Sequence, residues 1–172
     1  DQWHGMSRTG TVPRLFSHVA EAEIELNPQD CERRGFIDGG LVRVKNRRGQ
    51  FVARVRATAS IRAGQAFMPM HWGGQFMHGS GTNAVTIPVF DPTSRQPELK
   101  HSAVAIEKFS ARWQIVAMRR APAGAGDRTL ALQAQMQPWL ARCDHATLTL
   151  AGREEPLLIF RGWIEDEKLS KS

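Results

Sequence analysis

Apolar and polar positions alternate along much of the first half of the chain, which is typical of strands with one buried face. The run Glu21–Leu26 alternates carboxylates with apolar side chains, and the runs Leu41–Lys45 and Phe51–Ala57 alternate valines with cations. The polar segment Asn46–Gly49 joins the last two runs. We therefore expect one strand followed by a β-hairpin.

A short helix is expected between the first strand and the hairpin. Asn27 is the N-cap residue, Pro28 occupies the first helical position, and Asp30 favours the positive end of the helix. Gly35 follows at C-cap distance. Within this helix Cys31 is expected to be a small core residue, because free cysteines are usually buried.

Two further strands flank a long glycine-rich loop. Residues Ala66–Met70 are expected to form a buried strand that ends at its proline, and Ala103–Ile106 to form a short strand. The loop His71–Asn83 lies between them and has no periodicity. Such loops in compact domains are usually functional or disordered, and its aromatic and methionine content argues against disorder.

The pattern changes after Phe109, where we expect a small β-α-β-β appendage. The segment Ala121–Gly126 is rich in Ala, Pro and Gly and is typical of a linker, and Asp127 can cap a helix. The expected elements are a strand at 112–118, a helix at about 128–143, and strands at 146–150 and 156–164. The fold class is mainly β (α+β), with domains at 1–109 and 110–172. Trp113, Trp139 and Trp163 are expected in the core.

The first thirteen residues, Asp1–Pro13, have no strand or helix period and are rich in polar groups. Ser7, Arg8 and free backbone N–H groups suit phosphate oxygens, and Trp3 and His4 can lie against a planar heterocycle. The alternative is an ordered N-terminal arm that packs Trp3 and exposes the rest. Composition alone leaves both interpretations open.

The net charge of +6 and the pI of about 10.1 favour an anionic partner. The hairpin cations Arg43, Lys45, Arg54 and Arg56 form either an anion-binding face or, as we favour, a solvated outer face. No apolar run reaches membrane-spanning length, and no secretory h-region is visible. Because the sequence opens on Asp1, we expect a chain cut from a longer protein, in which any targeting segment would lie outside this sequence.

The cysteines and histidines predict no metal site in this chain. Two cysteines, Cys31 and Cys143, make no disulfide framework and suggest a reducing compartment. Neither a Cys-x-x-Cys motif nor ligand spacing among the six histidines is present. The histidines are His4, His18, His71, His78, His101 and His145.

An ordered set of motifs gives the sequence a family resemblance. The set comprises Trp3-His4, Met6-Ser7-Arg8-Thr9, Val12-Pro13, Asn27-Pro28-x-Asp30, Gly35, Asp38-Gly39, Arg47-Arg48-Gly49, Phe67-Met68-Pro69-Met70-His71-Trp72, Thr82-Asn83-Ala84, Asp91-Pro92 and Glu98-Leu99-Lys100. It resembles the C-terminal molybdopterin-dinucleotide-binding domain of the dimethyl-sulfoxide-reductase family, and within it the bacterial assimilatory nitrate reductase large subunits. The resemblance covers residues 1 to about 109 and is loose beyond.

The resemblance implies a double-psi β-barrel that closes over a molybdenum bis(molybdopterin guanine dinucleotide) cofactor. Asn83 would bind a pterin or its phosphate, Lys100 would reach the second pterin or its pyrophosphate, and Met70 and His71 would line the substrate funnel. The N-terminal cofactor contacts would be Asp1, Gln2, Trp3, His4, Gly5, Met6, Ser7 and Arg8. Gly5 departs from the family pattern, since relatives commonly have a hydroxyl residue after the Trp-His pair. Without the resemblance, Asn83 would be a turn residue and Lys100 a surface lysine.

The implied function is reduction of nitrate to nitrite, in nitrate assimilation, by a cytoplasmic enzyme of which this chain is one domain. The chain itself would carry no catalytic residue and would be inactive alone, and the iron–sulfur cluster and metal ligand would lie upstream. Partners would be the remaining domains and an electron-donor protein. Alternatives are a formate dehydrogenase or other oxyanion reductase, a basic nucleic-acid-binding barrel, and a docking domain without a ligand; the Met68-Pro69-Met70-His71-Trp72 run favours the nitrate branch.

Overall fold

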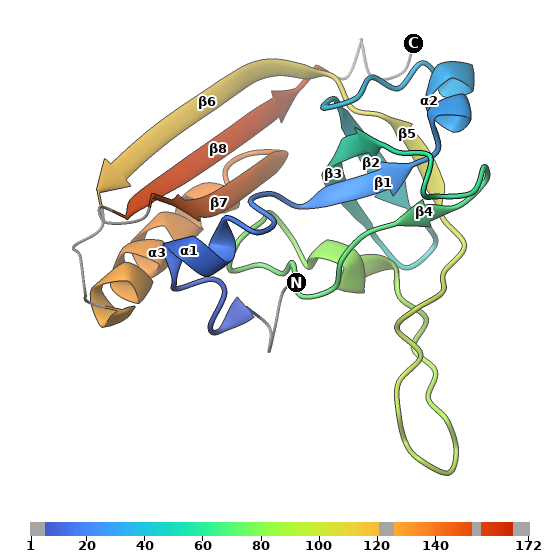
Figure 1. Cartoon of the computed structure of the whole chain (residues 1–172), viewed down its shortest axis with the longest axis horizontal. Coiled ribbons are helices and arrows are strands. Elements are labelled where there is room, and N and C mark those ends of the chain that lie inside the picture. The colour runs from blue at the N-terminus through green and yellow to red at the C-terminus, as the bar shows by residue number, and fades with distance from the viewer. Residues whose placement is uncertain (1–5, 121–125, 153–155, 167–172) are drawn as a thin grey trace.

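The protein is mainly β, with two sheets and few helices (Figure 1). The structure is a computed structural model and describes residues 6–120, 126–152 and 156–166. The elements are α1 (Pro13–Phe16), β1 (Glu23–Leu26), α2 (Pro28–Arg34), β2 (Leu41–Lys45), β3 (Gln50–Ala57), β4 (Ala66–Phe67), η2 (Gly81–Val85), β5 (Ala105–Lys108), β6 (Ala111–Arg120), α3 (Gly126–Leu140), β7 (His145–Ala151) and β8 (Leu157–Glu165).

The five-stranded sheet has the order β4-β1-β3-β2-β5 and curls into half a barrel (Figure 1). Strands β1 and β3 are parallel, and the other neighbours are antiparallel. The expected hairpin is confirmed, with Val44 opposite Phe51 and the Asn46 N–H bonded to the Gly49 carbonyl at 3.0 Å. Alternation buries Ile24 and Val42 and leaves charged neighbours on the other face.

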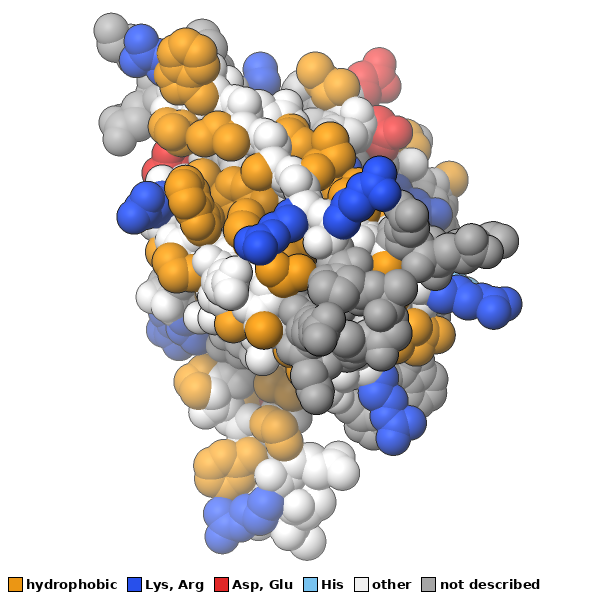
Figure 2. Space-filling model, turned by 90° about the vertical axis from the view of Figure 1, so that its left-hand side faces the viewer, with side chains coloured by type: hydrophobic (Ala, Val, Ile, Leu, Met, Phe, Trp, Pro, Cys, Tyr) orange, Lys and Arg blue, Asp and Glu red, His pale blue; other side chains and the backbone are white. Residues whose placement is uncertain are grey.

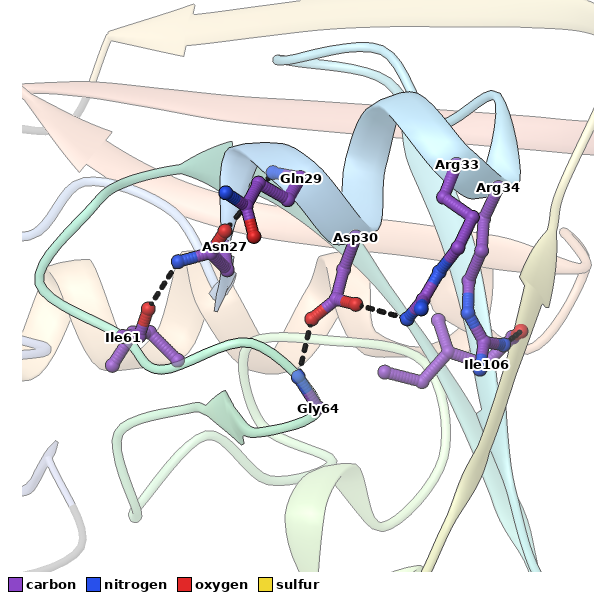
Figure 3. A network of polar contacts seen from close by, with 8 residues as sticks. All are labelled: Asn27, Gln29, Asp30, Arg33, Arg34, Ile61, Gly64 and Ile106. Atoms are coloured by element: carbon purple, nitrogen blue, oxygen red, sulfur yellow. Dashed lines mark hydrogen bonds and ion pairs between the residues drawn. The ribbon is translucent and has the colours of Figure 1, made fainter.

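Helix α2 is confirmed as predicted and anchors the chain that leads into β4. The Asn27 side chain accepts the Gln29 N–H at 2.9 Å and donates to the Ile61 carbonyl at 2.7 Å (Figure 3). Asp30 accepts the Gly64 N–H at 2.5 Å, and Gly35 ends the helix at φ 67°. Capping therefore fixes both the helix and the loop beside it.

The prediction of a buried strand at 66–70 is wrong in length and burial. Strand β4 covers Ala66–Phe67 alone, both residues are exposed, and the Phe67 side chain is 51% exposed. Pro69 has no N–H for a ladder, and His71 turns the chain at a φ of 78°. The strand lies at the sheet edge, where nothing in the described chain covers Phe67.

The second sheet is three-stranded and antiparallel, in the order β6-β8-β7, and the β-α-β-β element order is as predicted. Strand β7 is buried almost throughout. The backbone at its outer edge is hydrogen-bonded to the first half of the chain. The His78 N–H donates to the Ala146 carbonyl at 2.8 Å, and the Leu148 N–H donates to the Phe76 carbonyl at 2.7 Å. Side chains from before and after Phe109 belong to one hydrophobic cluster. Cys31 is part of this cluster and is buried, as expected.

Two of the three tryptophans expected in the core are not there. Trp163 is 5% exposed, but Trp113 and Trp139 are 61% and 51% exposed. Trp113 belongs to β6, an edge strand that nothing covers in the described chain, and Trp139 lies on the outer side of α3 against Arg142. The periodic pattern predicted the strand and the helix that carry these residues, but it could not show that the strand lies at the edge of its sheet.

The interpretation of the hairpin cations as a solvated outer face holds for Lys45 and Arg56, whose side chains are 44% and 61% exposed. It is wrong for Arg43 and Arg54, which are largely covered and paired with carboxylates. Arg43 binds Glu165 at 2.5 Å and its side chain is only 17% exposed. Arg54 and Arg161 both bind Glu21, at 2.7 and 2.5 Å. The five-stranded sheet is thereby connected to β8, directly through Arg43 and Glu165 and, through the shared Glu21, between Arg54 and Arg161.

No helix in the described ranges is long and apolar enough to cross a membrane. Both cysteines, Cys31 and Cys143, are free and buried.

His145 makes folding stability depend on pH. Its ring stacks on Trp163 with centroids 5.0 Å apart and is 2% exposed. Burial, with smaller contributions from His78 and Arg54, lowers the pKa of His145 from 6.5 to about 3. The unfolded chain therefore binds a proton between pH 6.5 and 3 that the folded chain does not, and stability falls as pH falls through this window.

We expect the loss attributable to His145 to reach about 1.4 kcal/mol per pH unit within that window. Denaturant unfolding of wild type and His145→Phe between pH 7.5 and 4.5 measures it, with His18→Gln as an exposed control. Parallel pH curves for wild type and His145→Phe would contradict the assignment.

Candidate functional site

A cavity of about 120 Å³ opens beside the five-stranded sheet. Its floor is apolar and comes from three strands, through Ile24, Val44 and Phe51. Its walls come from β4, from η2 and from the segment 99–104. Because the strand interiors supply the floor and the loops supply the walls, polar groups lie above an apolar base, the usual form of a ligand site.

A second, larger cavity of about 670 Å³ adjoins the first. The two share the wall residues Ala66, Phe67, Lys100, His101, Ser102 and Val104. The larger cavity continues toward α2, where Asp30 and Arg34 line it. Together they form one long groove, which suits an extended ligand better than a compact one.

The walls of the first cavity are held at the Val85 carbonyl oxygen. This oxygen accepts hydrogen bonds from Asn46 Nδ2 at 2.8 Å, Arg48 Nη2 at 3.0 Å and Ser102 Oγ at 2.6 Å. Arg48 Nη2 also donates to Ser102 Oγ at 2.8 Å. The hairpin turn thus connects η2 to the segment that carries Lys100.

Sequence reasoning missed these three side chains as site residues. Asn46 and Arg48 were assigned to a hairpin turn. The only signal was the polar Asn46–Gly49 segment itself, which predicts a turn whatever its side chains bind. Their contacts to Val85 and Ser102 join distant segments and need the tertiary structure.

The Glu98 carboxylate holds the backbone at Lys100, the residue expected to contact a phosphate, and at the next residue, His101. Its Oε1 accepts the Lys100 N–H at 2.7 Å and the His101 N–H at 3.3 Å. These bonds, the Lys100 N–H above all, lower the pKa of Glu98, so the carboxylate stays charged. In the described part of the chain no ion pair involves the exposed Lys100 side chain, which leaves its charge available to an anion.

The structure brings together three of the predicted site residues. Met70, Asn83 and Lys100 line the first cavity although they lie far apart in the sequence. His71 follows Met70 and is exposed but does not line either cavity. No sequence pattern could have placed all three at one cavity without the resemblance.

The N-terminal predictions fall partly outside the described residues, since Asp1, Gln2, Trp3, His4 and Gly5 are not among them.

Three N-terminal site residues are described, and none lines either cavity. The Met6 side chain is 0% exposed and packs in the core, whereas Ser7 and Arg8 are exposed. Gln133 of α3 donates to the Gly10 carbonyl at 2.8 Å and holds this segment in place.

Comparison with known proteins identifies the family of the chain. The profile of the molybdopterin dinucleotide binding domain matches residues 1–103. The chain belongs to this family. The matched range contains every residue that lines the first cavity except Val104.

Curated relatives carry two kinds of name, nitrate reductase and formate dehydrogenase. A nitrate reductase of Klebsiella oxytoca is 42% identical over 122 residues, which are 71% of this chain and 14% of that protein. The F420-dependent formate dehydrogenase 1 subunit alpha of Methanococcus maripaludis is 35% identical over 105 residues, 59% of this chain and 15% of that protein. A nitrate reductase of Shewanella frigidimarina is 29% identical over 125 residues, 62% of this chain and 13% of that protein. The chain thus spans about a seventh of the length of these relatives.

The donor set of the groove fits a pterin dinucleotide. The Lys100 ammonium could neutralise a pyrophosphate, and the Asn83 amide can both donate to and accept from a pterin edge. Thr82 and His101 add hydrogen-bonding groups on the same walls. The apolar floor suits flat rings, so the residues present match the chemistry of the family's ligand.

We expect Arg48→Ala to loosen both walls of the first cavity, because the Val85 carbonyl and the Ser102 hydroxyl lose a charged donor. The free energy of unfolding should fall by about 1–2 kcal/mol. Amide hydrogen exchange of residues 81–86 and 99–104 should accelerate together. The adjacent, exposed Arg47→Ala is the matched control and should change neither; equal effects of both variants would show that Arg48 has no specific role.

Proposed function

We propose that this chain is the C-terminal cofactor-binding domain of a molybdenum oxidoreductase that reduces nitrate to nitrite. The observation that carries the proposal is the placement of Met70, Asn83 and Lys100 around one cavity. These residues came from three separate motifs of the resemblance, and a shared cavity is what a common ligand requires.

The cofactor in this proposal is molybdenum bis(molybdopterin guanine dinucleotide), which supplies the oxygen-atom-transfer chemistry. Lys100 neutralises a pyrophosphate, and Asn83 hydrogen-bonds a pterin or its phosphate. The N-terminal residues 1–8 add further contacts, Met6 through its backbone because its side chain is buried. Met70 and His71 line the path of the substrate.

The remaining machinery of the enzyme lies outside this chain. The metal ligand and the iron–sulfur cluster belong to upstream domains, and an electron-donor protein reduces the enzyme, which works in the cytoplasm in nitrate assimilation. Residues 1–109 form the cofactor-binding unit, with the connectivity of a double-psi β-barrel, and residues 110–172 form an appended unit of another role. The half-barrel with its parallel pair β1 and β3 supports this architecture.

Nucleic-acid binding receives little support from the same geometry. Arg43, Lys45 and Arg54 pair with carboxylates, and Arg48 is engaged with Val85 and Ser102. The hairpin therefore offers few cations to a phosphate backbone.

The substrate is tested in the full-length enzyme. We expect nitrate-dependent oxidation of reduced methyl viologen and no reduction of an acceptor dye by formate. The Klebsiella and Shewanella relatives support the first outcome. Formate oxidation without nitrate reduction would instead assign the domain to a formate dehydrogenase, as the methanogen relative suggests.

The cofactor contact is tested by Lys100→Ala. We expect cofactor affinity to fall about tenfold, because one charge-assisted contact is lost. Molybdenum and guanine nucleotide per enzyme, measured after extended dialysis, report the loss, and Lys100→Arg should restore part of it. Lys108→Ala, an exposed cation on β5, is the control. Unchanged cofactor content, or loss of thermal stability in Lys100→Ala, would contradict the assigned role.

A further inference from the structure

Strand β6 has a free edge. It pairs with β8 on one side, and no other described strand lies on its second side. The opposite edge of the same sheet is closed, because β7 bonds to the segment around Met77. Figure 1 shows β6 at the outer border of the molecule. A long open edge presents a row of backbone donors and acceptors to a partner strand.

The side chains of β6 are apolar where an isolated surface strand would be polar. All ten residues are exposed, and Trp113, Ile115, Val116 and Met118 are 61%, 45%, 50% and 64% exposed. Ile115 and Val116 point to opposite faces, so both faces of the edge are apolar. Figure 2 shows apolar side chains gathered on the face at the left of Figure 1, with Lys and Arg among them.

The charge on this strand has one sign. Arg112, Arg119 and Arg120 are its charged residues. Arg119 donates to the neutral Gln135 side chain at 3.3 Å. Across the described ranges no ion pair involves Arg112 or Arg119, in contrast to the paired cations of the hairpin. An incoming strand thus meets two positive charges near the ends of an apolar stretch.

We propose that β6 is a docking edge for a separate protein, which adds an extended segment with alternating acidic and apolar residues as a fourth strand. Backbone hydrogen bonds would supply affinity, and the arginines would select acidic residues. The apolar side chains would pack against those of the added strand on both faces.

A second copy of this chain is a poor occupant. Antiparallel pairing of two β6 strands about the point between Ile115 and Val116 places Arg112 opposite Arg119. Parallel pairing in register places each arginine beside its equivalent. Like charges directly opposite destabilise strand pairs, so these two symmetric pairings are disfavoured.

The remaining domains of the enzyme are the alternative occupant that the test addresses. The groove floor belongs to the five-stranded sheet, whereas β6 borders the other sheet (Figure 1). Covering the groove therefore does not require covering β6, and the proposal stands whether or not the groove binds a pterin.

The probe is an acetylated peptide of four Glu-Val repeats, with four Lys-Val repeats as the matched control. At low salt, the Glu-Val peptide should slow hydrogen exchange at alternate amides of β6 in the 172-residue chain, because every second N–H faces the free edge. The Lys-Val peptide should have no effect. Equal binding of both peptides, or protection away from residues 111–120, overturns the proposal.

Charge reversal supplies the matched variants. Arg112→Glu with Arg119→Glu should weaken Glu-Val binding about tenfold and create binding of Lys-Val. Arg47→Glu with Arg62→Glu makes the same change in net charge at exposed sites elsewhere and should leave both affinities within about twofold. If the first variant unfolds, Arg112→Gln with Arg119→Gln gives the same comparison. Equal losses in the two charge-reversed variants overturn the proposal.

Two measurements identify the occupant. In the purified full-length enzyme, residues 111–120 should exchange rapidly until peptide is added; protection beforehand would show that the enzyme's own domains cover β6 and would overturn the proposal. The 172-residue chain should sediment as a monomer at every concentration. A dimer that Arg112→Glu with Arg119→Glu alters would show that a second copy is the occupant, and would overturn the proposal.

Discussion

One carbonyl oxygen, that of Val85, holds the groove together. It accepts hydrogen bonds from Asn46, Arg48 and Ser102, and so joins the hairpin turn, the helical turn η2 and the segment that carries Lys100. A carbonyl of a 6%-exposed residue needs such partners, since an unpaired buried polar group is costly. The geometry of the walls thus follows from satisfying one backbone acceptor.

Some cations of the chain form ion pairs that stabilise the fold, whereas others are exposed and unpaired within the described ranges. Arg43, Arg54 and Arg161 are used internally, where they bind Glu165 and Glu21 and connect the two sheets. Lys100 and Arg112 have no ion pair within the described ranges and face the groove and the free edge, respectively. Net charge therefore predicts an anionic partner, while the distribution of carboxylates decides where that partner can bind.

Local signals predicted the local structure well. The Asn27 cap and Gly35 set the bounds of α2, and the hairpin at 41–57 followed from alternation and its polar turn. The prediction failed where burial depends on distant neighbours. The apolar run at 66–70 became a two-residue exposed strand, and Trp113 came to lie on an open edge. An apolar pattern shows that a segment can be buried but does not show what covers it.

The sequence by itself determined the family, the mainly β fold class, and the candidates Met70, Asn83 and Lys100, because ordered motifs and strand periods are written in adjacent residues. Only the tertiary structure placed those three side chains at one cavity and connected the walls through Arg48. It alone also showed that β6 has one partner strand within the described part of the chain. These features arise from contacts between segments far apart in the chain, and a linear pattern carries no information on which of the possible partners a backbone or side-chain group finds.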